Sequence, residues 1–271
     1  MMQASLLPDG RLHLNHGPMD LICGAEGPGA AAGFRRAVAR FDGLLEELVA
    51  ELPALRVEVA VLQGQVARVM AAAVAPFRPD FITPMAAVAG AVAEAVLAVM
   101  VAGPGIARAY VNNGGDIALH LGAEQRFTCA MATGGRLVIG AGDSVRGIAT
   151  SGWRGRSWSL GIADAVTVVA RSAAMADAAA TMIANAVDLP GHPAITRRPA
   201  VEMQADSDLG QRLVTEGVGA LAGAEVARAL ARGVAAAGAY RARGLIEGAA
   251  LFLQGQSRIE GVLRLEEPEH V

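Results

Sequence analysis

The strongest candidate for chemistry is a carboxylate and a hydroxyl four residues apart, Asp177 and Thr181, in an Ala-rich segment. If this segment is helical, both side chains point from one face, one turn apart. A hard cation such as Mg²⁺ prefers oxygen ligands of this kind. A structural interpretation is also open. Asp177 would then lie in the first helical turn, where the helix dipole favours an acid, and Thr181 would bond back to a backbone carbonyl.

A second group of polar residues lies at a glycine turn between the hydrophobic runs 109–111 and 117–121. The turn reads Asn113-Gly114-Gly115-Asp116. Paired glycines between two such runs predict a β-hairpin, because glycine adopts positive φ without steric cost. Glycine also lets a backbone approach a ligand closely, and Asp116 would then accept a hydrogen bond at the mouth of the turn.

An Ala- and Val-rich segment supplies a third set of candidates. Thr83 and Pro84 predict the start of a helix that runs to Met100, with Thr83 as the N-cap. Gly90 lets this helix pack very close to a neighbour or a ligand. Glu94 is then a buried or site-facing acid, or its side chain extends to water.

The elements that must position these residues follow from periodicity. The chain opens with strands at 11–14 and 19–23, and apolar residues at helical spacing predict one long amphipathic helix over 30–52. The segment 55–74 is ambiguous between strand and helix. Further strands are expected at 126–131, 136–139, 144–149 and 165–170, a helix at 218–237, and a final strand pair from 244 to 265. No linker or repeat divides the chain, so we expect one α+β domain over 1–271, with antiparallel sheets and packed helices.

Composition excludes several classes of function. The chain has 271 residues, 53% of them hydrophobic, and a formal net charge of -3. The Arg residues are scattered and only 4% of the residues are aromatic, so the sequence shows neither the clustered positive charge nor the stacking residues typical of nucleic-acid binding. The run 85–103 has the length of a membrane span, but Glu94 near its centre favours a buried helix. Without a secretory signal or a metal-type cysteine spacing, we expect a cytoplasmic protein that binds neither membranes nor zinc.

Three separated blocks resemble the ApbE superfamily, which contains the FAD:protein FMN transferases. They lie at 84–90, 113–117, and 149–152 continuing to 176–181, within a match that spans roughly 83–185. Their joint occurrence is far more specific than any one block. The residues of these blocks are most similar to those of a shorter branch of that superfamily, whose function is not established.

The resemblance implies a Mg²⁺-dependent flavin site. Asp177 and Thr181 would hold the metal, which bridges to the FAD diphosphate. If the chain is an enzyme, Asp116 and Glu94 are the nearest candidates for the catalytic acid or base. The residues implied to line the nucleotide site are Gly90, Asn113, Gly114, Gly115, Asp116, Thr150, Ser151, Gly152, Ser157 and Ser159.

Two departures bear on the activity. The gap after Gly152 is much shorter than in the transferases, so the histidine of their flavin segment is missing, and the Ala-Lys-Gly of their helix block is replaced by Val88-Ala89-Gly90. Loss of a cation from a phosphoryl-transfer site weakens transfer more than binding. Two hypotheses therefore remain. One is a Mg²⁺-dependent enzyme acting on FAD or a related dinucleotide, with a protein acceptor as partner. The other is a flavin- or small-molecule-binding protein without transfer chemistry. Homo-oligomerisation is left open.

Overall fold

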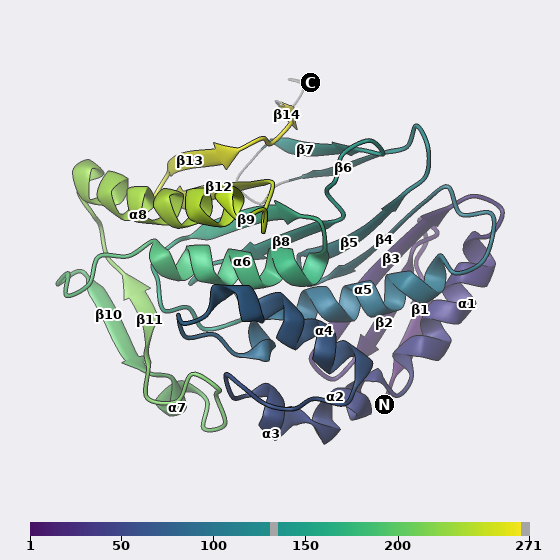
Figure 1. Cartoon of the computed structure of the whole chain (residues 1–271), viewed down its shortest axis with the longest axis horizontal. Coiled ribbons are helices and arrows are strands. Elements are labelled where there is room, and N and C mark those ends of the chain that lie inside the picture. Colours follow the sequence, from purple (N-terminus) through teal and green to yellow (C-terminus); the bar gives the residue numbers. More distant parts are fainter. Residues whose placement is uncertain (131–134, 267–271) are drawn as a thin grey trace.

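An antiparallel sheet forms the centre of the molecule (Figure 1). The computed structural model describes residues 1–130 and 135–266, and within them nine strands pair in the order β1-β2-β3-β4-β5-β8-β9-β12-β13. Their bounds are β1 (Gln3–Leu6), β2 (Leu12–His16), β3 (Met19–Glu26), β4 (Arg108–Asn113), β5 (Asp116–Leu121), β8 (Gly147–Ser151), β9 (Ala165–Ala170), β12 (Gly248–Leu253) and β13 (Gln256–Gly261). The prediction of an α+β domain with antiparallel strands is confirmed.

Helices cover one face of this sheet (Figure 1). α1 (Ala30–Phe41), α5 (Val88–Met100), α6 (Ala173–Ala186) and α8 (Gly223–Ala242) pack directly on the strands. A second layer, α4 (Gln65–Val74) with the 3₁₀ turn η2 (Pro84–Ala87), lies against α5 and α6, and the 3₁₀ turn η1 (Ala75–Phe77) packs on α4. The short helices α2 (Leu44–Ala50) and α3 (Leu52–Leu55) follow α1. Most of the buried apolar residues lie between these helices and the sheet.

A second, smaller core lies on the opposite face. Ile117, Leu119 and Val169 pack there against Leu137 and other residues of a small sheet. That sheet has the order β14-β7-β6, from β14 (Leu265–Glu266), β7 (Arg136–Gly140) and β6 (Arg126–Ala130). Successive strand residues point to opposite faces, so Ala118 belongs to the helix-side core while its neighbours Ile117 and Leu119 belong to the other. Asp116, two residues before Ala118, therefore points toward the helices.

A separate ribbon completes the fold at the edge of the molecule (Figure 1). It pairs β10 (Ile195–Pro199) with β11 (Leu213–Val218), and α7 (Ala200–Met203) follows β10 directly. Because Val218 ends β11, the helix predicted over 218–237 begins later, at Gly223. The strand predicted from 144 likewise begins at Gly147, and of the strand predicted over 126–131 the last residue, Met131, lies outside the described residues.

The predicted single helix over 30–52 is wrong. α1 ends at Phe41 and α2 begins at Leu44, because Gly43 has a φ of 84°, which a right-handed helix cannot contain. Thr83 is also not a side-chain cap for the following turn. Its hydroxyl donates a hydrogen bond to Asp208, 125 residues away, and α5 proper begins only at Val88.

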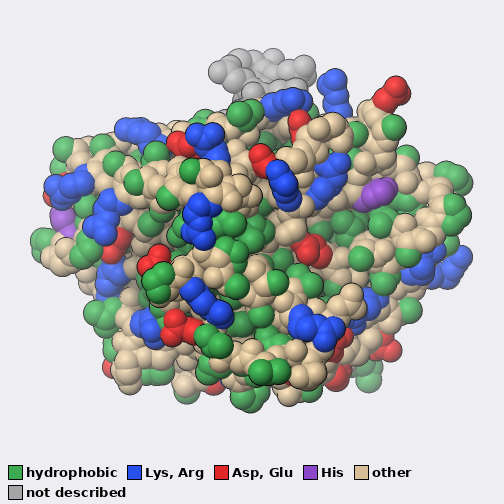
Figure 2. All heavy atoms as spheres, viewed as in Figure 1, with side chains coloured by type: hydrophobic (Ala, Val, Ile, Leu, Met, Phe, Trp, Pro, Cys, Tyr) green, Lys and Arg blue, Asp and Glu red, His purple; other side chains and the backbone are tan. Residues whose placement is uncertain are grey.

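Charged side chains of both signs are interspersed over the face of the molecule that Figure 2 shows. Apolar side chains lie between them, and this face has no continuous area of one sign. In the described part of the chain, no helix combines the length and the apolar character needed to cross a membrane.

Candidate functional site

The first turns of α5 and α6 lie side by side on the helix-covered face of the sheet, where the two helices meet with their N-terminal ends near the centre of the molecule (Figure 1). Gly90 allows this approach. A Cβ atom at position 90 would lie 2.3 Å from the carbonyl oxygen of Ala173 and 2.7 Å from the amide nitrogen of Ala174. The close packing expected of Gly90 is therefore with the neighbouring helix.

Each of these two helices caps the other. The amide of Gly90, in the first turn of α5, donates to Asp177 Oδ2 at 3.0 Å. The amide of Ala174, in the first turn of α6, donates to Glu94 Oε1 at 3.0 Å. Carboxylates placed in this way satisfy amide groups that a helix leaves without partners, and they complement the positive ends of both helix dipoles.

Asp177 is the fifth residue of α6, which begins at Ala173 after the side-chain N-cap Ser172. It therefore lies beyond the first turn of its own helix and caps α5 instead. The Thr181 hydroxyl, one turn further along α6, makes no hydrogen bond to any residue that the structure describes, so back-bonding to a carbonyl is not observed.

The glycine turn between β4 and β5 meets the start of α5. Asn113 opposes Asp116 across the hairpin, and its side-chain amide donates to the carbonyl oxygen of Ala89 at 3.2 Å. The Gly115 amide donates to Asn112 Oδ1 at 2.8 Å. This turn amide is thus used within the turn and is not free to bind a phosphate.

Asp116 connects this turn to the block 149–152, which also resembles the ApbE superfamily. Its Oδ1 accepts a hydrogen bond of 3.1 Å from the amide of Thr150, the fourth residue of β8. The Thr150 hydroxyl in turn pairs with that of Thr167 at 2.9 Å. β5 and β8 are adjacent in the sheet, which explains why residues 34 positions apart in sequence meet here.

The acid pair of Asp116 and Asp177 is the electrostatic centre of the site. Asp116 is only 9% exposed, and burial raises its pKa from 3.8 to about 7, against the opposing effects of the Thr150 amide and the Arg156 charge. Burial also raises the pKa of Asp177 well above its ordinary value, and repulsion from Asp116 raises it further. The amides of Gly90 and Ala89 act in the opposite direction. Two carboxyl groups in this relation favour a bound proton or cation between them.

Arg156 is a functional candidate that the sequence analysis missed. It lies in the exposed loop between β8 and β9, and its guanidinium rests on Gly114. The loop is anchored by Asp164, whose Oδ1 accepts from Trp153 Nε1 at 3.2 Å and from Arg154 Nε at 2.7 Å. The available signal was the pair Arg154 and Arg156 in the shortened gap, where the resemblance drew attention to a missing histidine.

The predicted site residues separate into two groups. The structure brings together Gly90, Asn113, Gly114, Gly115, Asp116, Thr150 and Asp177. Ser159 lies elsewhere. It is buried, and its hydroxyl donates to Asn185 Oδ1 at 3.2 Å, near the C-terminal end of α6 and about 12 Å along the helix from Asp177.

The remaining predicted residues have different surroundings. Gly152 is buried where a Cβ would lie 2.5 Å from the Asp164 carbonyl oxygen, and Ser151 pairs with Val166 of β9. Ser157 is exposed in the Arg156 loop. Burial raises the pKa of Glu94, and its carboxylate is engaged by the start of α6.

The site offers few ligands for a metal ion. Within the described residues, no group of three or more His, Cys, Asp or Glu side chains has the arrangement of a metal site. Asp116 and Asp177 provide two carboxylates at most. Two carboxylates fit Mg²⁺, which keeps several waters and completes its octahedron with substrate phosphates.

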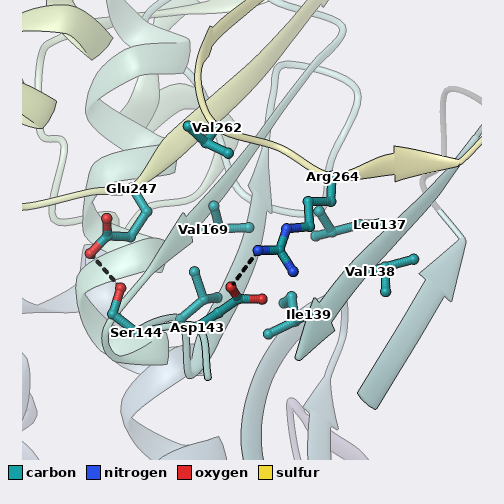
Figure 3. Close-up of a pocket in the computed structure, with 10 residues that line it drawn as sticks. Leu137, Val138, Ile139, Asp143, Ser144, Val169, Glu247, Val262 and Arg264 are labelled. Carbon is teal, nitrogen blue, oxygen red and sulfur yellow. Dashed lines mark hydrogen bonds and ion pairs between the residues drawn. The ribbon is translucent and has the colours of Figure 1, made fainter. Parts of the chain in front are cut away.

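Two hollows of the surface lie apart from the acid pair. The first, about 120 Å³, lies between the small sheet and the main sheet, on the side away from α5 and α6 (Figure 3). Leu137, Ile139 and Val169 give it apolar walls, and Asp143 pairs with Arg264 at 3.2 Å on its rim. The second, about 440 Å³, is lined by the loop after α6 and by Arg228 and Arg232 of α8. Neither includes a residue predicted for the site.

Comparison with known proteins identifies the family. A family model described as "AbpE bacteria" matches residues 4–259. A UPF0280 protein of Methanopyrus kandleri is 35% identical over 175 residues, covering 61% of this chain and 69% of that protein. UPF0280 proteins of Methanosphaerula palustris and Methanoculleus marisnigri are 38% and 46% identical, over 54% and 38% of this chain. The matched segment spans 58% and 45% of the length of those two relatives. Because the family match extends over nearly the whole sequence, the chain belongs to the AbpE bacteria family.

Proposed function

We propose that this protein is a Mg²⁺-dependent enzyme that cleaves or transfers part of FAD or a related dinucleotide at the acid pair. The observation that carries the proposal is the relation of Asp116 to Asp177, two buried carboxyl groups that repel each other beside the starts of two helices. Burying two acids together is unfavourable unless a cation or a proton is shared between them. A site of this kind is better suited to holding a divalent ion than to stabilising the fold.

In this proposal Asp177 and Asp116 hold the ion, and Thr181 remains a predicted ligand one turn beyond Asp177. Mg²⁺ bound there supplies neutralisation of phosphate charge and polarisation of the phosphorus centre. Asp177 keeps its position because the Gly90 amide fixes Oδ2, and Asp116 keeps its position because the Thr150 amide fixes Oδ1. Fixed carboxylates lower the reorganisation that ion binding requires.

Exposed groups at the edge of the site would contact the ligand. Gly114 and Thr150 are exposed, and so is the loop that carries Arg156. Asn113 ties the glycine turn to the first turn of α5, so the turn and the helix would move together when a ligand binds. The geometry supports a ligand that approaches from this edge with its phosphates toward the acid pair.

The alternative is a binding protein that holds a flavin or another small molecule without transfer. One observation favours it. The amides of Gly90 and Gly115 already donate to Asp177 and to Asn112, so they are not available to stabilise charge that develops during transfer.

Incubation of the purified protein with FAD distinguishes the two candidates. Reactions would contain Mg²⁺ or EDTA, with and without a protein acceptor, and FMN, AMP and protein-bound flavin would be measured by chromatography and fluorescence. The enzyme proposal expects Mg²⁺-dependent products that Asp177→Asn removes and that Arg35→Gln, an exposed substitution on α1, leaves unchanged. Mg²⁺-dependent binding without product would support the binding protein. Neither binding nor product would refute both.

A further inference from the structure

One positive charge faces the acid pair from outside the sheet and the helices. Arg156 is in the loop between β8 and β9, and its charge lowers the pKa of Asp116. Its guanidinium lies directly over Gly114, at the tip of the glycine turn. A Cβ at position 114 would be only 1.8 Å from Arg156 Nη2, so the guanidinium would have to move to admit any other residue, and the φ of 66° at Gly114 independently favours glycine.

The loop that carries Arg156 is held by contacts of its neighbouring residues, and none of these contacts uses the N–H groups of the Arg156 guanidinium. Arg154, two residues earlier, is engaged by Asp164 at 2.7 Å and lies over the Trp153 ring at 4.8 Å. The Gly155 amide closes the loop onto the Gly152 carbonyl oxygen at 3.0 Å. Among the residues that the structure describes, the Arg156 guanidinium has no hydrogen-bond or ion-pair partner. An anchored loop therefore presents an exposed guanidinium beside the acid pair, with Nη2 against Gly114.

The chemistry of these groups defines what such an arginine would bind. A guanidinium presents a planar set of N–H donors that matches the oxygens of a phosphate, and charge-assisted bonds of this kind are about twice as strong as neutral ones. The neighbouring carboxylates would repel a phosphate unless a cation lies between them. A phosphate held by both a cation and Arg156 would have its charge neutralised from two sides.

We propose that Arg156 binds a phosphate of a diphosphate-bearing ligand at the edge of the acid pair and thereby restricts the site to phosphorylated substrates. This inference rests on the proposed function, because it places the ligand's phosphates next to Asp116 and Asp177. The sequence predicted that this site lacks a cation, because the lysine of the transferases' helix block is absent here. Arg156 supplies a positive charge to the site from a loop and not from α5.

Isothermal titration with two probes, inorganic pyrophosphate and FAD, tests the inference in Mg²⁺ and in EDTA. The proteins are wild type, Arg156→Gln, Arg156→Lys, Asp177→Asn and the charge-matched control Arg35→Gln. Arg35 is exposed on α1, next to Arg36, which bonds to the C-terminal end of α5, far from the first turn that meets the acid pair. Unfolding curves of the variants verify that each is folded.

Arg156→Gln is expected to weaken pyrophosphate and FAD binding by roughly 10- to 100-fold, in Mg²⁺ and also in whatever binding persists in EDTA. Arg156→Lys should fall between Gln and wild type, because an ammonium keeps the charge but loses the planar donor set. Arg35→Gln should change either affinity less than about twofold, as a distant exposed charge is screened by salt.

The outcomes separate this inference from the proposed function. If Arg156→Gln binds both probes as Arg35→Gln does, while Asp177→Asn removes the Mg²⁺ dependence, the role of Arg156 is refuted and the proposed function stands. If wild type binds neither probe in Mg²⁺, both are refuted. If Arg156→Gln loses pyrophosphate but not FAD, the guanidinium binds free phosphate only, and its role toward the dinucleotide is overturned.

Discussion

Replacing Asp116 by Asn should change how the stability of the protein depends on pH. The substitution removes a buried charge but keeps the shape of the side chain, and Asn Oδ1 can still accept the hydrogen bond from the Thr150 amide. Any large effect therefore comes from the ionisation of the acid pair and not from altered packing.

The size of the effect follows from the pKa of Asp116, which burial raises from 3.8 in the ordinary state to about 7 in the folded protein. Between these values the folded state binds one more proton than the unfolded state, so the free energy of unfolding falls as pH rises. The stability that the protonated group provides is complete below pH 3.8 and is lost as pH rises through about 7. At about 1.4 kcal/mol per pKa unit, wild type should lose up to about 4 kcal/mol relative to Asp116→Asn.

Urea unfolding at several values between pH 5 and pH 8 measures the part of this loss that occurs above pH 5, about 3 kcal/mol at about 1.4 kcal/mol per pKa unit. Wild type should lose stability relative to Asp116→Asn as pH rises, and the loss belongs to the pair, because removing Asp116 also relieves the repulsion that raises the pKa of Asp177. Asp206→Asn is the control. Its carboxylate is exposed, and the hydrogen bond from Gln204 and the pairing with Arg56 lower its pKa, so it adds no pH dependence in this range.

Mg²⁺ gives the same experiment a second readout. A cation held by both carboxylates should restore much of the wild-type stability near pH 8 and should affect Asp116→Asn little. Parallel pH profiles for wild type and Asp116→Asn would show that the two acids do not interact in the folded protein, and the electrostatic argument for the site would fail.

Three further predictions concern the contact between α5 and α6. Gly90→Ala should destabilise the protein by at least about 2 kcal/mol in urea unfolding, because a Cβ there meets the Ala173 carbonyl at 2.3 Å, whereas Gly238→Ala on α8, with no neighbour closer than 3.8 Å, should be neutral or slightly stabilising. Glu94→Ala should cost about 1 kcal/mol more than Glu94→Gln, which keeps an acceptor for the Ala174 amide, and equal losses would contradict the cap. Asp177→Ala should abolish the Mg²⁺-dependent part of FAD binding in calorimetry, and an unchanged titration would leave Asp177 as a helix cap only.

Asp177 itself shows how far sequence reasoning reached. The sequence predicted either a metal ligand or an acid in the first turn of its own helix. The structure gives it a partner on another helix, the amide of Gly90, at a separation of 87 residues. Its loss therefore has a structural effect as well as the proposed functional one, and the titration needs the unfolding measurement beside it.

The sequence alone determined the features that depend on neighbouring residues. Paired glycines between alternating runs specified the β4–β5 hairpin, because positive φ at Gly114 and Gly115 is a local property of the backbone. The Ala-rich run ending at Ala186 specified α6, and Ser172 caps it as local helix chemistry favours. The helix over 30–52 failed at a local feature as well, since the positive φ of Gly43 outweighed a continuous hydrophobic period.

Only the tertiary structure determined which of these elements contact one another and how their side chains interact. Strand order places β5 beside β8, which brings Asp116 to Thr150, and the packing of α5 on α6 brings Asp177 to Gly90 and Glu94 to Ala174. The raised pKa of Asp116 and Asp177 and the position of Arg156 over Gly114 follow from that packing. Burial and charge proximity depend on distances between segments that lie far apart in the chain, and no periodicity within a segment encodes such distances.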